Sequence, residues 1–404
     1  MISKNKICDT ENVIKIIFVI SIICSNSFIV NYIKKLYNET VLKWENNPIN
    51  LPSIKNEILS YESFINISLS SLNLKNFEKC SEPKISLIVP IYNFQCNIIN
   101  FYLSIYNQSL TDIEIIFINN NGSETNTMNI IKALMSKDNR ITYINNDNKI
   151  PDFSPKKKGI LSAKGEYILI IEPNDLLLNN ILEKSYLIAK KNNIDILQYY
   201  IMVGTYKNNR LWKNIKCNNG IINYPKVEKF FFKCRYFNLL DKLIKREIFI
   251  DSFKDMTEIY DKDDFYELSD DDLAFFSLAK KAKSYGFFED VGYFYNLYST
   301  SSTGRSYFYM NKKWDEMFYK LFKTLIYFFE KTKNNRLEKG WVFKFFLEKI
   351  YSYKSKLIYL NKNFGYFSSI IDTFLGCNLF NKSEKEKLIK FKNMIIDIKN
   401  RLGY

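Results

Sequence analysis

Two short acidic stretches carry the side chains best suited to chemistry on a phosphorylated or hydroxylated substrate. The first, Glu172–Asp175, reads Glu-Pro-Asn-Asp and follows an apolar run, and the second, Asp270–Asp272, precedes another. Carboxylate and amide oxygens bind hard divalent cations such as Mg²⁺ and Mn²⁺, and a carboxylate can remove a proton from an attacking hydroxyl. Both stretches also have a plain structural interpretation, because Asn and Asp form turns that precede helices and Asp stabilises helix N-termini.

Residue types that are absent or scattered exclude several kinds of catalytic and metal site. The 404-residue chain has no histidine, which excludes a Ser-His-Asp triad and a zinc site built on histidine. Its seven cysteines are scattered without a CxxC pair, which argues against a cysteine-rich zinc site. Acid–base chemistry therefore falls to Asp, Glu, Lys, Tyr or Cys.

The net charge of +15 raises the question of a nucleic-acid partner. The basic residues are mostly lysines, whereas planar arginine is the side chain that recognises phosphate best. The abundance of Lys, Asn, Ile, Tyr and Phe is instead typical of an AT-rich coding sequence. We therefore expect no nucleic-acid partner.

The segment around the first acidic stretch alternates apolar strands with helices. We predict strands at 85–89 (ended by Pro90), 113–118, 141–144, 167–171 and from 194, and helices at 97–108, 124–136, 158–164 and 179–191. Unbroken apolar strands separated by helices are typical of an α/β domain with a mostly parallel sheet flanked by helices. Ligands bind beyond the carboxyl ends of such strands, where the polar clusters of this chain lie.

Motifs in this order resemble those of glycosyltransferase family 2. They are ISLIVPIYN from residue 85, IEIIFINNNGSE from 113, GILSAKGEYILIIEPNDLLL from 159, and DKLIKREIF from 241 followed by SDDDLAFFSLAKK from 269. The resemblance covers roughly residues 84–300. It implies a GT-A (Rossmann-like) fold and inverting transfer of a sugar from a nucleotide-diphosphate donor to a hydroxyl of a glycan, lipid or protein, with Mn²⁺ or Mg²⁺ as cofactor.

The resemblance also implies roles for individual residues. Glu172 and Asn174 occupy the metal-binding DxD position, where an uncharged Asn lowers the expected affinity for the cation, and Asp175 would bind the donor. In the second acidic stretch, Asp272 would be the catalytic base with Asp271 beside it. The remaining residues of the predicted donor site are Pro90, Tyr92, Asn93, Asn119, Asn120 and Lys156.

A second interpretation keeps the fold but not the reaction. Asn119, Asn120 and Asn174 stand where the family usually has Asp. They would favour a catalytically degenerate module that binds a nucleotide or glycan without turnover.

Outside the α/β region the chain divides into three further segments. Residues 1–35 contain an uncharged run at 16–33, which predicts a membrane anchor, with a cleaved signal peptide or a buried helix as alternatives. Residues 36–83 are predicted to be a stem, 84–305 the glycosyltransferase-like domain and 306–404 a helical C-terminal region. We expect a single-pass membrane protein of the secretory pathway, in the Golgi or endoplasmic reticulum.

Overall fold

The computed structural model describes residues 50–63, 69, 72, 74–91, 98–119, 125–145, 154–212, 220–223, 238–257, 270–297, 371–372, 375–376 and 382–401. The predicted anchor at 16–33 and the candidate residues Tyr92, Asn93 and Asn120 lie outside these ranges. Within them, no helix combines the length and the apolar character needed to cross a bilayer.

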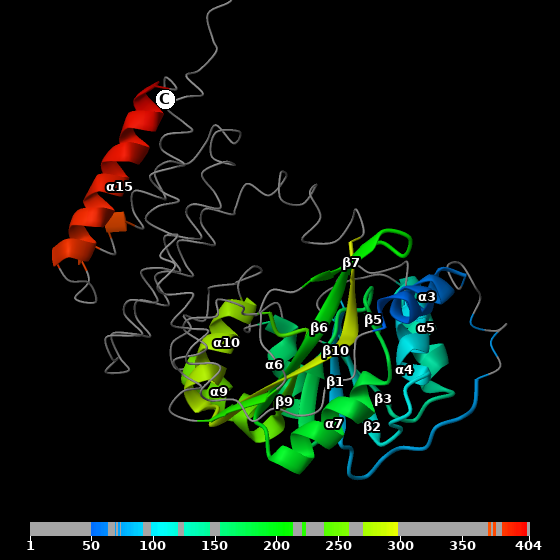
Figure 1. Cartoon of the computed structure of the whole chain (residues 1–404). Coiled ribbons are helices and arrows are strands. Elements are labelled where there is room, and N and C mark those ends of the chain that lie inside the picture. Colours follow the sequence, from blue (N-terminus) through cyan, green and yellow to red (C-terminus); the bar gives the residue numbers. More distant parts are fainter. Residues whose placement is uncertain are drawn as a thin grey trace, which may run out of the picture.

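One mixed sheet organises the described part of the chain (Figure 1). Its central path runs β3-β2-β1-β4-β9-β6-β10-β5, while β7 pairs with β6 and β8 pairs with β10. The strands are β1 (Ile85–Ile91), β2 (Ile113–Asn119), β3 (Ile141–Asn145), β4 (Tyr167–Ile170), β5 (Leu176–Leu177), β6 (Ile196–Gly204), β7 (Asn209–Trp212), β8 (Gly220–Asn223), β9 (Lys242–Lys245) and β10 (Ser284–Asn296).

The prediction of a mostly parallel sheet was only partly correct. β1, β2, β3 and β4 are parallel, as are β6 and β10. However, β9 lies between β4 and β6 and is antiparallel to both, and β5, β7 and β8 also add antiparallel pairs. All strands predicted from apolar runs point in one direction, and the strands that make the sheet mixed are short ones that we did not predict.

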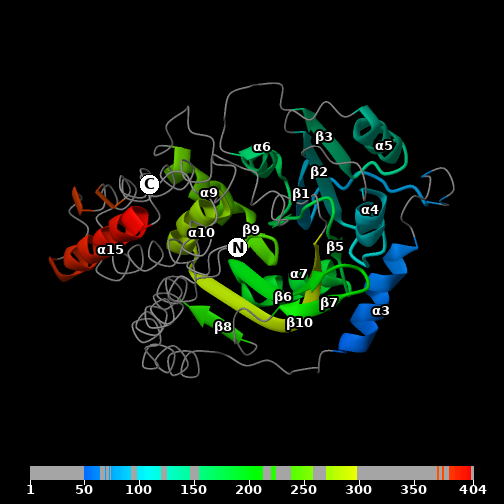
Figure 2. The same ribbon diagram turned by 90° about the horizontal axis from the view of Figure 1, so that it is seen from above.

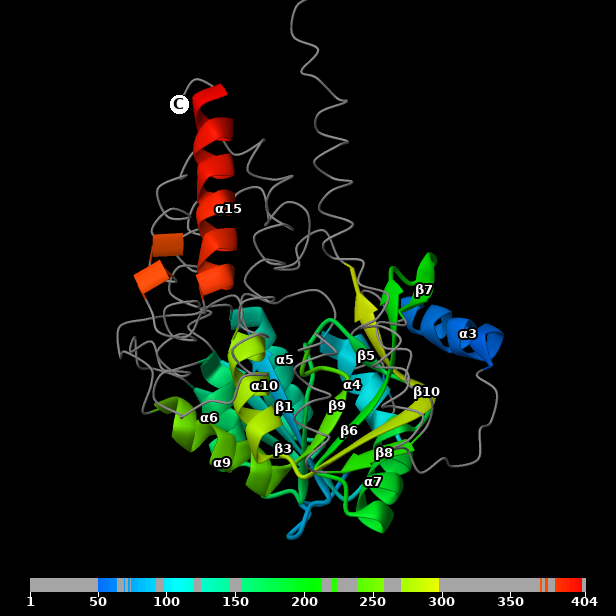
Figure 3. The same ribbon diagram turned by 60° about the vertical axis from the view of Figure 1, so that its left-hand side comes forward.

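Helices flank the sheet, as predicted, although their ends differ by a few residues from the expected ones. The largest difference is at α6, which begins four residues before the predicted start at 158. The helices are α3 (Leu51–Glu62), α4 (Ile98–Tyr106), α5 (Thr125–Met135), α6 (Ser154–Ser162), α7 (Ile181–Asn192), α9 (Arg246–Thr257), α10 (Asp270–Lys281) and α15 (Lys382–Arg401). Figure 3 shows α9 and α10 side by side, and the Ser277 hydroxyl joins them by donating to the Ser252 carbonyl oxygen at 2.8 Å.

The central strands are apolar at consecutive positions because both faces of the sheet are covered. Ile88 and Ile118 face α6, where a Cβ added to Gly159 would lie 2.7 and 2.6 Å from their side chains. Phe117 points to the opposite face and packs against Phe101 of α4, with ring centroids 6.0 Å apart. Adjacent residues of one strand thus fill two separate layers of core.

Part of the predicted stem is packed against the α/β domain. Helix α3 lies next to α4 (Figure 2). It buries Ile54, Ile58 and Tyr61, and the Asn100 amide of α4 donates to the Tyr61 carbonyl oxygen at 3.0 Å. Pro52 does not interrupt this helix because it lies in the first turn, where no intrahelical N–H bond is lost.

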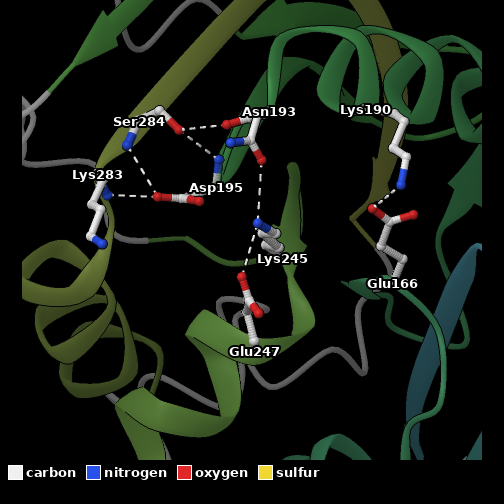
Figure 4. A network of polar contacts seen from close by, with 8 residues as sticks. All are labelled: Glu166, Lys190, Asn193, Asp195, Lys245, Glu247, Lys283 and Ser284. Atoms are coloured by element: carbon white, nitrogen blue, oxygen red, sulfur yellow. Dashed lines mark hydrogen bonds and ion pairs between the residues drawn. The ribbon is translucent and has the colours of Figure 1, made fainter.

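Polar contacts join the strands at the edge where β6 and β10 begin (Figure 4). The Asp195 carboxylate accepts hydrogen bonds from the backbone N–H groups of Lys283 and Ser284, at 2.6 and 3.2 Å. The Ser284 hydroxyl donates to the Asn193 carbonyl oxygen at 3.1 Å, and Lys245 at the end of β9 reaches the Asn193 side chain at 3.3 Å. The polar groups at this edge of the sheet therefore stabilise the fold. The predicted site residues lie at the opposite edge, where the parallel strands end.

Candidate active site

The carboxyl ends of β2 and β3 bring three polar side chains together. Asn119 and Asn145 are the last residues of these strands and are partners in the ladder. The Asn119 amide donates to Asn145 Oδ1 at 3.1 Å, and Lys158 Nζ of α6 donates to the Asn145 carbonyl oxygen at 2.9 Å. We predicted Asn119 from the sequence but missed Asn145 and Lys158. The predicted Lys156 lies in the same helix and is half-buried.

Pro90 lies within β1 and does not end it, contrary to our prediction. Ile171 donates its N–H to the Ile88 carbonyl oxygen at 3.1 Å, so the backbone groups of Ile88 face β4. Pro90 faces the same side two residues later, where β4 has already ended at Ile170. Because proline has no N–H, the strand loses no ladder bond there and continues alongside β2 to Ile91.

The Glu-Pro-Asn-Asp stretch forms a tight turn at the carboxyl end of β4. The Asp175 N–H donates to the Glu172 carbonyl oxygen at 3.1 Å and closes the turn. The chain then enters β5, which separates the turn from α7, so the turn does not cap that helix. Glu172 is half-buried, and 9% of the accessible surface of Asn174 remains exposed.

Asp175 differs from the other residues of the turn because it is fully buried. One carboxylate oxygen accepts from the Tyr293 hydroxyl at 2.6 Å, and the other accepts from the Asn296 N–H at 2.9 Å. Burial raises the pKa of the Asp175 carboxyl well above its usual value, although these two hydrogen bonds act in the opposite direction. Asp175, which we predicted to contact substrate, is instead held by protein groups on both oxygens.

The second acidic stretch forms the start of α10. Asp270, Asp271 and Asp272 are its first residues, and their side chains lie outside the described part of the structure. β10 begins at Ser284, soon after α10 ends at Lys281. The end of α10 is therefore near the Asp195 edge, and the three aspartates lie at the other end of a helix about 18 Å long.

The family model described as Glycosyl transferase family 2 matches residues 86–253, which run from the second residue of β1 past the end of β9 and include the whole turn after β4. Residues 86–253 are therefore similar to glycosyltransferase family 2. The match ends before α10, so the predicted catalytic aspartates lie beyond it.

Curated proteins with similar sequences agree with this match. Glycosyltransferase GlyG of Streptococcus pneumoniae is 34% identical over 124 residues, which are 31% of this chain and 39% of GlyG. GalNAc(5)-diNAcBac-PP-undecaprenol beta-1,3-glucosyltransferase of Campylobacter jejuni is 36% identical over 111 residues, 27% of this chain and 35% of that protein. The chain thus matches well under half the length of either relative.

Solved structures establish the fold over a longer range. The crystal structure of S. aureus TarS in complex with UDP-GlcNAc aligns with 79% of this chain and 92% of that chain, with a TM-score of 0.60 and 14% sequence identity. The described domain therefore has a GT-A-like fold, with a curled mixed sheet flanked by helices.

The donor atoms of the turn fit a divalent cation only in part. Glu172 can supply one carboxylate, and Asn174 can supply one uncharged carbonyl oxygen. Both oxygens of Asp175 are already engaged. Nowhere in the described ranges do three or more His, Cys, Asp or Glu residues form a group that could hold a metal ion. Since Mg²⁺ is commonly bound by one or two carboxylates together with substrate phosphates, this set fits a cation that arrives with a diphosphate.

Proposed function

We propose that this protein transfers a sugar from a nucleotide-diphosphate donor to a hydroxyl group of a glycan, lipid or protein. The observation that carries the proposal is the family 2 match, which spans the strands whose carboxyl ends bear Asn119 and the turn Glu172–Asp175. The TarS structure with UDP-GlcNAc supports the same class of donor, because its fold is similar.

The donor would lie along the carboxyl ends of β1 to β4. Asn119 can accept hydrogen bonds from a nucleoside and donate them to it. Pro90 pairs with Ile118, next to Asn119, in the β1–β2 ladder. Tyr92 and Asn93 follow β1 in the sequence, and Asn120 follows Asn119. Lys156 would contact the diphosphate. Glu172 and Asn174 would hold Mn²⁺ or Mg²⁺, which supplies positive charge to the leaving phosphate when it is bound.

The acceptor hydroxyl needs a base when it attacks the anomeric carbon. We assign this role to Asp272, with Asp271 as a neighbour whose charge favours retention of a proton. The hydroxyl oxygen forms the new glycosidic bond, its proton passes to Asp272, and the bond to the nucleotide diphosphate breaks. Attack from the face opposite the leaving group inverts the anomeric configuration.

The test is a panel of UDP- and GDP-sugars, each with and without Mn²⁺, using the full chain in detergent. Calorimetry would measure binding, and mass spectrometry would detect the transferred or hydrolysed sugar. We expect at least one donor to bind in a Mn²⁺-dependent manner and to be consumed. Binding without consumption would instead favour the non-catalytic module, and the absence of both would reject the proposal.

We further propose that residues 16–33 attach the chain to a membrane of the secretory pathway. The uncharged run and its flanking lysines, Lys15, Lys34 and Lys35, support this location.

A further inference from the structure

Four hydrogen bonds, three of them buried and one partly buried, tie the turn after β4 to the end of β10. The Glu172 N–H donates to Tyr293 Oη at 3.2 Å, and the Tyr293 hydroxyl donates to the Asp175 carboxylate at 2.6 Å. Asn296 donates its backbone N–H to the same carboxylate at 2.9 Å and its side-chain amide to the Asn174 carbonyl oxygen at 3.3 Å. We call these contacts the turn lock.

The turn lock acts on the backbone of the two residues proposed to hold the cation. Tyr293 fixes the amide of Glu172, and Asn296 fixes the carbonyl group of Asn174. The adjacent ladder between β5 and β10 pairs Leu176 with Phe294 (Figure 1). The turn is therefore held from its first residue to the strand that follows it, and each of the contacts in the turn lock comes from β10.

One polar atom of the Asn296 side chain lacks a hydrogen-bond partner. The side chain is fully buried, and the atom without a partner is Oδ1. Turning the amide over would place Oδ1 against the Asn174 carbonyl oxygen, so the orphan acceptor cannot be satisfied without losing the contact to the turn. A buried unsatisfied acceptor destabilises a fold, so the contact between Asn296 and the turn has a cost in stability.

We propose that Asp175, Tyr293 and Asn296 are positioning residues for the donor site. They do not touch the donor, and they set the spacing between the Glu172 carboxylate and the Asn174 amide. This inference rests on the proposed function, because it assigns to the turn a bound cation and diphosphate. It predicts that loss of one buried hydroxyl, remote from any substrate, changes the metal dependence of donor binding.

The test compares two Tyr→Phe variants of the full chain. Tyr293→Phe removes the central hydroxyl of the turn lock. Tyr102→Phe is the matched control, because the buried Tyr102 hydroxyl also donates to a buried carboxylate, that of Asp138 at 3.1 Å, near the start of β3 and away from the turn. The probe is calorimetric binding of UDP and of GDP over a range of Mn²⁺ concentrations.

We expect both variants to lose a similar amount of thermal stability. Only Tyr293→Phe should weaken Mn²⁺-dependent binding, by about tenfold, since a hydrogen bond to a charged group is of that strength. Equal nucleotide binding by the two variants would overturn the inference and leave the proposed function intact. If the wild type binds neither nucleotide, the proposed function fails.

Hydrogen exchange without ligand provides an independent test of the turn lock. In Tyr293→Phe the Glu172 amide has lost its acceptor, so it should exchange faster than in the wild type and in Tyr102→Phe. Unchanged exchange across residues 172–175 would overturn the inference whatever the nucleotide data show. Asn296→Ala serves as a second variant, and we expect it to loosen the same turn while it keeps the backbone contact to Asp175.

Discussion

Asp175 and Asn174, neighbours in the turn after β4, have different roles: Asp175 holds the turn in place and Asn174 is available to a ligand. Asp175 carries a carboxylate, but protein groups from β10 occupy both of its oxygens. Asn174 keeps a small exposed fraction but has no charge. A bound cation would therefore interact with the full negative charge of Glu172 but only with the dipole of Asn174. A substitution at Asn174 is for that reason the most direct test of cation binding at this turn.

We predict that Asn174→Asp strengthens Mn²⁺-dependent nucleotide binding by about tenfold, because a charged oxygen replaces a neutral one as ligand to a hard cation. Calorimetry at fixed nucleotide and varied Mn²⁺ measures the gain. Asn56→Asp is the matched control, since it adds the same charge on the exposed surface of α3. A gain of equal size in both variants would point to a general electrostatic effect, and no gain in either would argue against a cation at this turn.

At the start of α10, we predict that Asp272→Asn lowers the transfer rate by ~10²–10⁴-fold, the usual contribution of a general base. Donor binding should change little, because the base acts on the acceptor in the transition state. Rates with the donor found by the panel, together with calorimetry, separate the two effects. Asp270→Asn is the control, as Asn still stabilises a helix start. Equal loss of rate in the two variants would contradict the assignment of Asp272.

The site residues that could be predicted from the sequence are those marked by a pattern in the residues next to them. Asn119 and Glu172 could be predicted because each directly follows an apolar run, and Asn174 because it lies in the short turn that Glu172 opens. Asn145 was missed because it is one of several asparagines in the stretch 145–148, and only the β2–β3 register places it beside Asn119. Tyr293 was missed because an aromatic residue inside a strand is normally core, and nothing local indicates a contact with a carboxylate more than a hundred residues away.

Among the elements, the connection between α6 and β4 depends on one glycine. A Cβ added to Gly165 would lie 2.5 Å from the Ser86 backbone nitrogen and 2.6 Å from its hydroxyl. The Gly165 N–H also donates to that hydroxyl at 2.8 Å, while the hydroxyl donates to Glu114 at 2.6 Å. Three segments thus meet where no side chain fits.

We predict that Gly165→Ala lowers the free energy of unfolding by about 1–3 kcal/mol, the usual cost of forcing an extra group into a packed site. Chemical denaturation measures the change. Gly376→Ala is the control, because a Cβ there would meet nothing within 4 Å. A Gly165→Ala protein as stable as the wild type would mean that β1 and β4 can separate enough to admit a methyl group.

Two of the strands that could not be predicted from the sequence, β5 and β9, lack a recognisable apolar run. β5 has two residues, and β9 reads Lys-Leu-Ile-Lys, which resembles an exposed segment more than a strand inside a sheet. The structure buries Lys242 completely by pairing its ammonium with Asp241 at 2.6 Å. Burial of a charge depends on a partner brought by the fold, so the apolar pattern could not identify β9 and the sheet was predicted to be more parallel than it is.

At the scale of the whole molecule, α3 attaches the first residues that the structure describes to the α/β domain. Its buried residues Ile54 and Ile58 pack into the core, and Glu57 accepts a hydrogen bond from the Asn179 backbone at 3.0 Å. Those contacts connect a segment predicted as a stem to the residues just before α7.

We predict that a chain lacking residues 1–35 is released from membranes with its stability unchanged. A chain lacking residues 1–63 should unfold at a temperature roughly 10 °C lower, because each buried isoleucine contributes about 1.5–3 kcal/mol. Membrane fractionation and thermal unfolding measure the two effects. Full-length protein found in the soluble fraction after gentle lysis would contradict the anchor, and equal melting temperatures would contradict the packing of α3.

The position of β9 has a consequence for how the chain is synthesised. β9 occupies the place between β4 and β6, yet it comes after both in the sequence. While the ribosome translates the residues between them, the edge of β4 has no neighbour, and an apolar strand edge without a neighbour can pair with other chains. Residues 242–245 must leave the exit tunnel before the two halves of the sheet can join. A pause in translation upstream of this segment would therefore prolong the period in which the nascent chain is prone to aggregate.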